Sequence, residues 1–216
     1  MRKIYLLPSL CLFLFASCSP RLVTQGIKDK TSNYIVTADG KHINTSSISM
    51  EGSSITADTT TYPLTNLSAI KQGQAYYGVK NGKLYNGVYY GKLMLLARYA
   101  GRSYDMQTHA SHPVYDYYLQ KEDEPEIIDL TGKNLVESVR DNPLALRKAR
   151  ASRIYANISI ISAATAITGL SCVFLSYSSP IRKTAVTVGL FSMPTFLITL
   201  PIASHKRYKT IIVYNR

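Results

Sequence analysis

Cysteine is scarce in this chain and tryptophan is absent. The last third of the chain also lacks acidic residues. The 216 residues include three cysteines and no tryptophan. Cys11 and Cys18 lie near the N-terminus, and Cys172 lies in a distant apolar stretch. A disulfide framework is therefore excluded. The chain is long enough for one domain of ordinary size plus an appendage, and that domain must be held together by its core.

The net charge of +12 is unevenly distributed. Residues 18–146 contain thirteen Lys or Arg and thirteen Asp or Glu, whereas residues 147–216 contain ten Lys or Arg and no acid. These ten residues flank two apolar stretches, whereas a nucleic-acid surface gathers its cations on one folded face. Cations beside apolar segments suit anionic lipid headgroups. We therefore expect membrane lipid as a partner and no nucleic acid.

Familiar catalytic and metal-binding patterns are also missing. The sequence has no Gly-x-Ser-x-Gly, Walker or His-Glu-x-x-His motif. His109 and His112 lack a third ligand at metal-site spacing, and a polar loop is the simpler interpretation. The acidic residues at 122–124 and 126 lack a calcium-loop pattern and predict a solvated turn. We expect no catalytic residue, no metal and no cofactor, and a protein that is not an enzyme.

The first residues read as an export signal. Arg2 and Lys3 precede the apolar stretch 4–16, and small residues follow just before Cys18. This pattern resembles a bacterial lipoprotein signal, which is removed before a cysteine that carries the lipid; Phe15 stands where that family usually has Leu. The alternatives are an ordinary secretory signal cut elsewhere and an uncleaved anchor helix.

We accordingly predict a signal peptide over 1–17, lipidation of Cys18 and a tether over 18–31. Two or three acyl chains hold a protein at a membrane almost permanently, because each buried CH₂ contributes about 0.8 kcal/mol. Ser19 is not the Asp that, by resemblance to enterobacterial lipoproteins, retains a protein at the inner membrane. The expected location is the cell envelope, facing the periplasm, with the outer membrane favoured over the inner.

Residues 32–129 are typical of a β-rich domain. Asp39-Gly40 and Asn81-Gly82 are hairpin-turn signals between strand-like segments. We expect an α+β fold that begins with seven to nine short strands in a small antiparallel sandwich or rolled sheet. Many of the seventeen tyrosines lie in these strands. They form either the ordinary aromatic surface of a half-buried sheet or a ligand-binding face.

After Thr131, a good helix N-cap, the apolar spacing becomes helical. We predict short helices over 130–153, a hydrophobic two-helix hairpin over 154–204 and a basic tail over 205–216. Residues 155–177 carry no charge and would span about 33 Å, close to the hydrocarbon thickness of a bilayer. Pro194 and Pro201 are expected to kink or fray the second helix. The alternative is a buried helix pair in a soluble domain.

One conflict accompanies the membrane interpretation. If residues 18–154 are periplasmic, the basic clusters at 147–153 and 206–209 are periplasmic too, and only Arg182 and Lys183 lie on the other side. That arrangement opposes the positive-inside rule. The first apolar segment is also rich in Ser and Thr. A weak segment of this kind would pass the export channel and join a membrane or a partner later.

Three short stretches resemble a family of uncharacterised Gram-negative envelope lipoproteins: 117–121, Leu130 to Leu135, and Asp141-Asn142-Pro143. The terminal Tyr214-Asn215 is also similar to that family's ending. The resemblance implies a lipid-bearing cysteine, a β-rich domain, a short helix and a hydrophobic C-terminal segment. It implies no activity, so Cys18 is the one functional residue that it assigns.

These observations predict a non-catalytic accessory or structural subunit of a membrane complex. The alternative is a surface lipoprotein that binds a glycan or peptide with its tyrosine-rich sheet. The two hypotheses differ in what they expect of the tyrosines. Ligand binding requires a concave face of accessible rings, whereas a structural role requires rings that are mostly packed.

Overall fold

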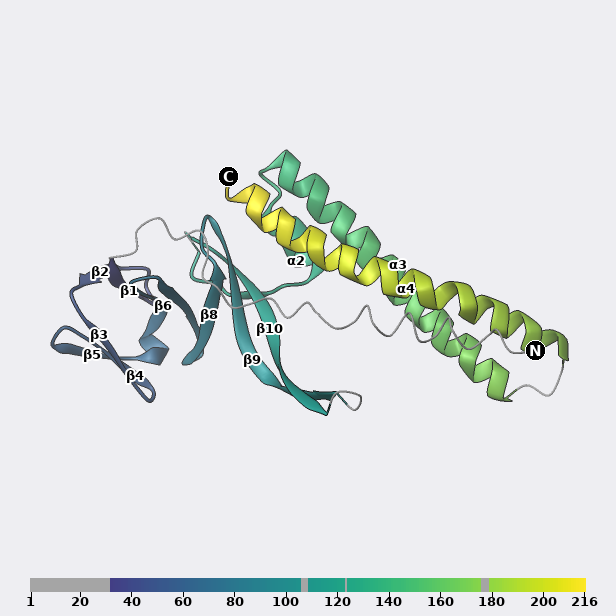
Figure 1. Cartoon of the computed structure of the whole chain (residues 1–216). Helices are drawn as coiled ribbons and strands as arrows, with labels where there is room; N and C mark the ends of the chain where they lie inside the picture. Colours follow the sequence, from purple (N-terminus) through teal and green to yellow (C-terminus); the bar gives the residue numbers. More distant parts are fainter. Residues whose placement is uncertain (1–31, 106–108, 123, 176–178) are drawn as a thin grey trace.

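A computed structural model describes residues 32–105, 109–122, 124–175 and 179–216. The predicted signal peptide, the tether and Cys18 lie outside these residues. The described chain forms strands first and helices afterwards, as Figure 1 shows. The strands are β1 (Asn33–Thr37), β2 (His42–Thr45), β3 (Ile48–Glu51), β4 (Ser54–Ala57), β5 (Thr60–Pro63), β6 (Leu67–Gln72), β7 (Ala75–Lys80), β8 (Lys83–Tyr89), β9 (Leu93–Asp105), β10 (Ala110–Lys121) and β11 (Ile128–Asp129). The helices are the 3₁₀ turn η2 (Leu64–Asn66), α2 (Gly132–Ser138), α3 (Pro143–Leu175) and α4 (Ser179–Tyr214).

The strands form two antiparallel sheets, which confirms the predicted α+β class. The larger sheet has the order β11-β10-β9-β8-β7-β6-β1-β2, and β3-β4-β5 form a smaller one. The described chain has more strands than the seven to nine expected. One reason is that the strand-like segment after Asp39-Gly40 is divided: the chain leaves the large sheet after Thr45 and enters the small one at Ile48.

Local sequence explains the turns. Asn81 and Gly82 have φ angles of 53° and 67°, which Asn and Gly adopt most readily, and they join β7 to β8 as predicted. Asp39-Gly40 also lies in a hairpin, but the loop is longer than two residues, because β1 pairs with β2 from Val36 and His42. At the β4–β5 turn, the Asp58 carboxylate accepts hydrogen bonds from the backbone N–H groups of Ser46 and Ser47 at 2.9 and 3.0 Å.

Both faces of the large sheet are covered. In β9, Leu93 and Leu95 pack on one face while Met94 and Leu96 pack on the other, which is why this strand is continuously apolar. One face meets the small sheet over β1, β6 and β7, and meets α2 and the base of α3 and α4 over β8 to β10. On the other face, Ile127 packs onto Tyr76, Tyr85 and their neighbours.

The helical region begins as predicted. The Thr131 hydroxyl accepts a hydrogen bond from the N–H of Asn134 at 3.1 Å and caps α2, whose Leu135 is buried. Asn142 then caps α3 through its Oδ1, which accepts from the N–H groups of Leu144 and Ala145. Pro143 occupies the first position of that helix, where its missing N–H costs nothing.

Two predicted boundaries are wrong. Residues 143–153 are not a separate short helix but the first turns of α3, and residues 205–214 are not a tail but the last turns of α4. These basic segments stay helical because Ala145, Ala149 and Ile211 pack into the sheet's core. Pro194 and Pro201 both lie inside α4, which continues past them.

Candidate functional site

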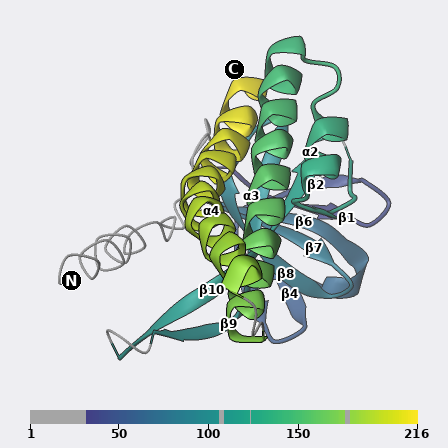
Figure 2. The ribbon, with the colours of Figure 1, turned by 90° about the vertical axis from the view of Figure 1, so that its right-hand side faces the viewer.

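The α3–α4 hairpin is the most distinctive surface of the molecule. The two helices run side by side away from the sheets, so that α3 ends and α4 begins far from them (Figures 1 and 2). Their contact consists of small side chains. The buried residues on α3 are Ala145, Ala149, Ser152, Ala156, Ser159, Ser162, Ala166 and Gly169; those on α4 include Ala185, Thr199, Ala203 and Thr210.

Small residues let the two backbones approach closely. A Cβ on Gly169 would lie 3.1 Å from the Ala185 carbonyl oxygen and 3.4 Å from the Gly189 nitrogen. Nearer the base, the Ser152 hydroxyl donates a hydrogen bond to the Ala203 carbonyl at 3.0 Å. Helices in lipid pack in this way, by small residues and interhelical hydrogen bonds.

The large apolar side chains point outward instead. Ile167 is 66% exposed, Phe191 75% and Leu190 66%. Further exposed apolar residues on the two helices are Ile154, Ile160, Ile161, Met193, Ile198 and Leu200. A soluble helix pair buries its large side chains against a core and exposes polar ones, and this pair does the reverse. Within the described residues, the outer face of the hairpin is therefore not covered by a core.

Among the described residues, one helix is long and apolar enough to cross a membrane. It covers Lys183–Tyr214, with a mean hydropathy of 1.8 in its most apolar window and 11% of that window buried. Length and composition alone support this assignment.

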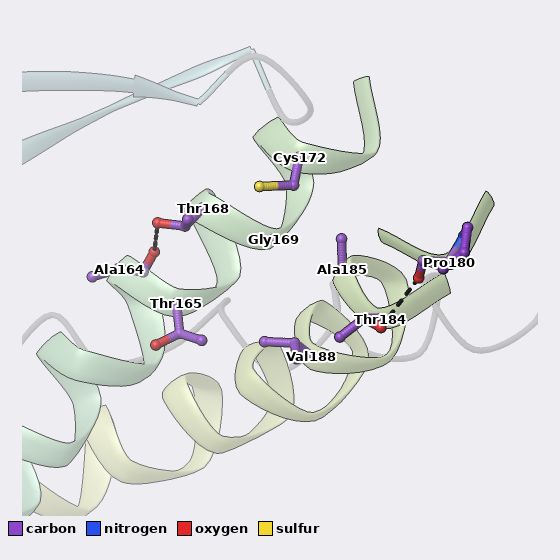
Figure 3. A pocket seen from close by; sticks show the side chains of 9 residues that line it. All are labelled: Ala164, Thr165, Thr168, Gly169, Cys172, Pro180, Thr184, Ala185 and Val188. Atoms are coloured by element: carbon purple, nitrogen blue, oxygen red, sulfur yellow. Dashed lines mark hydrogen bonds between the residues drawn. The ribbon is translucent and has the colours of Figure 1, made fainter. Parts of the chain in front are cut away.

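Towards their far ends the helices leave an open, mostly apolar groove of about 590 Å³. Figure 3 shows its lining, with Gly169 and Cys172 on α3 facing Thr184 and Val188 on α4. The hydroxyls of Thr168 and Thr184 donate to carbonyls of their own helices, those of Ala164 and Pro180. The groove therefore presents few free polar groups.

The base of the hairpin is fixed to the large sheet by its last residues. The Asn215 side chain accepts from the N–H of Leu93 and donates to the carbonyl of Leu93, both at 2.8 Å. The Tyr214 hydroxyl donates to the Asp141 carboxylate at 2.8 Å. Two stretches that carry the family resemblance, Asp141-Asn142-Pro143 and Tyr214-Asn215, therefore meet in the fold. We call this set of contacts the C-terminal clamp.

A second candidate site lies on the opposite face of the large sheet. Strand register places Tyr34, Lys71 and Tyr76 opposite one another on β1, β6 and β7. The Tyr76 and Tyr90 rings lie 5.3 Å apart, and the Tyr34 and Tyr90 hydroxyls are hydrogen-bonded at 3.0 Å. A pocket of about 280 Å³ opens here, lined by Tyr34, Val36, Gly40, His42, Ser68, Ala69, Tyr76, Tyr90, Met94, Gln120, Glu122, Glu124 and Pro125. We call it the tyrosine pocket.

Buried polar groups form its floor. The Tyr76 hydroxyl donates to Oε1 of the buried Gln120 at 3.2 Å. Burial and the Glu122 carboxylate raise the pKa values of Tyr76 and Tyr90, and burial and the hydrogen bond with Tyr90 raise that of Tyr34. All three phenols therefore keep their protons at physiological pH; the Tyr76 hydroxyl donates to Gln120, and one of the Tyr34 and Tyr90 hydroxyls donates to the other.

The tyrosines of the sheet are mostly packed. Tyr76 and Tyr85 are buried, and most others in the strands are half-buried. Tyr99 and Tyr104 are exceptions, with 52% and 60% exposure on the part of β9 that extends past β8. The general prediction of rings on a half-buried sheet fits most positions, and the tyrosine pocket is the one concave exception among those described.

The other candidate residues are separated in space. Nδ1 of the exposed His109 is hydrogen-bonded to the Tyr104 hydroxyl at 2.9 Å, and His112 is paired with Ser103. Glu124 forms an ion pair with Lys121 at 3.3 Å. Among the described residues, no three His, Cys, Asp or Glu side chains gather as a metal site would require. The sequence did not indicate that Glu122 and Glu124 border a tyrosine pocket, because Tyr34 on β1 and Glu122 after β10 are far apart in the sequence and come from strands that are not neighbours in the sheet.

Neither a protein-family description, nor a characterised protein, nor a solved structure matches the chain.

Proposed function

We propose that this protein is a lipid-anchored, non-catalytic cell-envelope protein that serves as an accessory or structural subunit of a membrane complex. Its lipid would be carried by Cys18 and its β-sheets would face the periplasm, with the outer membrane favoured over the inner. The observation that carries the proposal is the hairpin, which has small residues inside and large apolar residues outside. Exposed apolar surface of this extent requires lipid or a protein partner.

The C-terminal clamp supports a structural role. Ile211 on α4 packs in one cluster with Leu93 and Leu119 of the sheet, and Asn215 is hydrogen-bonded to Leu93. The sheets are therefore held to the hairpin by both packing and hydrogen bonds. A domain connected in this way holds a fixed position relative to the membrane, which suits a subunit that supports a larger assembly.

Photo-crosslinking in cells tests the proposed complex. A photoreactive amino acid is placed at Ile167 or Phe191 on the outer face of the hairpin, and the protein is extracted with a gentle detergent. We expect a specific protein adduct from one of these positions and co-migration of the protein with that partner on a native gel. The control position is Leu144, which is equally exposed at 69% but lies at the base of the hairpin. A protein that migrates alone, with lipid adducts only, would contradict the subunit proposal.

The tyrosine pocket favours a second candidate function, the binding of a glycan or peptide. Aromatic rings beside an amide and carboxylates provide an apolar surface with a few directed polar groups, as small-ligand sites do. Glycan and peptide arrays probed with the protein should then give a signal that Tyr90→Leu reduces at least tenfold. Tyr104→Leu, on the exposed end of β9, is the matched control. Equal loss in both variants, or no array signal, would leave packing as the role of these rings.

A further inference from the structure

The cations of the C-terminal third gather at one end of the hairpin. The antiparallel arrangement of α3 and α4 brings the start of one helix beside the end of the other, next to the large sheet (Figure 1). Seven cations lie on these turns: Arg147, Lys148, Arg150, Arg153, Lys206, Arg207 and Lys209. We call them the basic collar. The opposite end of the hairpin has Arg182 and Lys183, so the two ends differ strongly in charge.

The collar lacks acidic neighbours in its own helices. Residues 142–216 contain no Asp or Glu. The ion pairs found among the described residues, Lys121–Glu124 and Arg140–Glu137, do not involve the collar. Within the described structure, Nε of Arg207 is buried without a hydrogen-bond partner. A buried guanidinium nitrogen of this kind is costly unless an anion or another acceptor reaches it.

The collar ends where the exposed apolar surface begins. On α3, the exposed Ile154 follows Arg153 directly, and on α4 the apolar Leu200 precedes Lys206 by about one and a half turns. At the boundary, Nζ of Lys206 lies 5.2 Å from the centre of the Tyr155 ring. Tyrosine and basic residues at the ends of an apolar segment are the arrangement found at the headgroup level of membranes.

We propose that the basic collar binds the phosphate groups of anionic phospholipids in the leaflet that faces the β-sheets. The inference rests on the proposed membrane location of the hairpin, and it adds the lipid class and the side of insertion. The hairpin enters this leaflet by its distal end, so only Arg182 and Lys183 cross the bilayer. The collar stays behind, held by headgroups on the side of the sheets. This route removes the conflict with the positive-inside rule, because the rule applies to segments inserted during synthesis and not to a hairpin that enters after export.

Each Lys or Arg near an anionic membrane surface strengthens binding about fivefold. Full-length protein in a neutral detergent is titrated with phosphatidylglycerol or with phosphatidylcholine of the same chain length, and retained lipid is counted by native mass spectrometry. We expect the protein to retain phosphatidylglycerol preferentially, with an affinity that falls as ionic strength rises. The variant Arg147→Gln/Lys148→Gln/Arg150→Gln should bind this lipid on the order of 100-fold more weakly.

The matched control is Lys41→Gln/Lys83→Gln/Arg102→Gln, which removes the same charge from exposed positions of the β-rich part of the chain and should bind like the unmodified protein. Equal affinity for the two lipids, or equal loss in the control variant, would overturn the inference. Competition by inorganic phosphate at the same concentration as the lipid would also overturn it, because the collar would then be a general anion site. If the collar variant does not fold, the unmodified protein still tests the inference: its affinity for phosphatidylglycerol should fall as ionic strength rises, and an affinity that does not change with salt would overturn the inference.

Carbonate extraction separates this inference from the proposal on which it rests. If the protein resists carbonate extraction but binds the two lipids equally, the membrane location of the hairpin stands and the proposed role of the collar is wrong. An unlipidated protein that carbonate releases would overturn both.

Discussion

Replacing Ile167 or Phe191 with aspartate is expected to release an unlipidated form of the protein from membranes. In this form, residues 1–18 are replaced by a conventional cleavable secretory signal, so that no acyl chain holds the protein. Both positions are on the outer face of the hairpin, with 66% and 75% exposure. A carboxylate near the middle of a membrane span costs about 3 kcal/mol. Each substitution should therefore reduce the carbonate-resistant fraction, and the two together should abolish it.

The control for this prediction is Leu144→Asp in the same unlipidated form. Leu144 is 69% exposed and lies in the first turn of α3, beside the collar. A carboxylate there remains in water and favours the helix N-terminus, so membrane retention should be unchanged. The prediction fails if all three variants behave alike. If the unlipidated protein with the native hairpin is soluble after export, the lipid is the sole anchor and the hairpin contacts a protein partner instead.

Replacing Gly91 with alanine should weaken the attachment of the hairpin to the sheet. A Cβ on Gly91 would lie 2.5 Å from Cγ of Asn215, so the asparagine must move. It would then lose its two hydrogen bonds to Leu93, each 2.8 Å long. Two such bonds contribute about 1–3 kcal/mol to stability, which corresponds to a decrease in unfolding midpoint of roughly 2–12 °C for a chain of this size. Thermal unfolding followed by tyrosine near-ultraviolet circular dichroism measures the change.

A double-mutant cycle shows whether the C-terminal clamp is the cause. Asn215→Ala alone should destabilise the protein by a similar amount. Gly91→Ala should then cost little more in the Asn215→Ala protein, because the steric conflict and the hydrogen bonds are already gone. Gly189→Ala is the control glycine, since a Cβ at that position meets nothing within 4 Å. Additive losses at positions 91 and 215 would mean that each acts independently of the clamp.

Much of the fold follows from local sequence rules. The Asn81-Gly82 turn and the Thr131 cap were each predicted from residues with strong conformational preferences. The charge-free segments likewise indicated two long apolar helices. Helix ends were harder to predict, because charge marked residues 205–216 as a tail. Their helical state depends on Thr210 and Ile211, which are fully buried in the folded protein.

The tyrosine pocket shows what strand order contributes. Tyr34 and Tyr76 are far apart in sequence and meet because β6 lies between β1 and β7. Gly87 on β8 leaves room for the ring, since a Cβ there would lie 2.9 Å from the Tyr76 carbonyl oxygen. Sequence alternation identifies which residues share one face of a strand, but it does not identify the neighbouring strand.

The sequence alone determined the elements of this protein: strands before helices, two long apolar segments and a last third that carries cations but no acids. These properties depend on residue type and near neighbours, which a linear pattern records. The tertiary structure decided three other things: that the apolar helices turn their large side chains outward, that the two basic clusters meet beside the sheet, and that the last residues fasten the hairpin to β9. Each depends on contacts between distant segments, and those contacts form only when the whole chain packs.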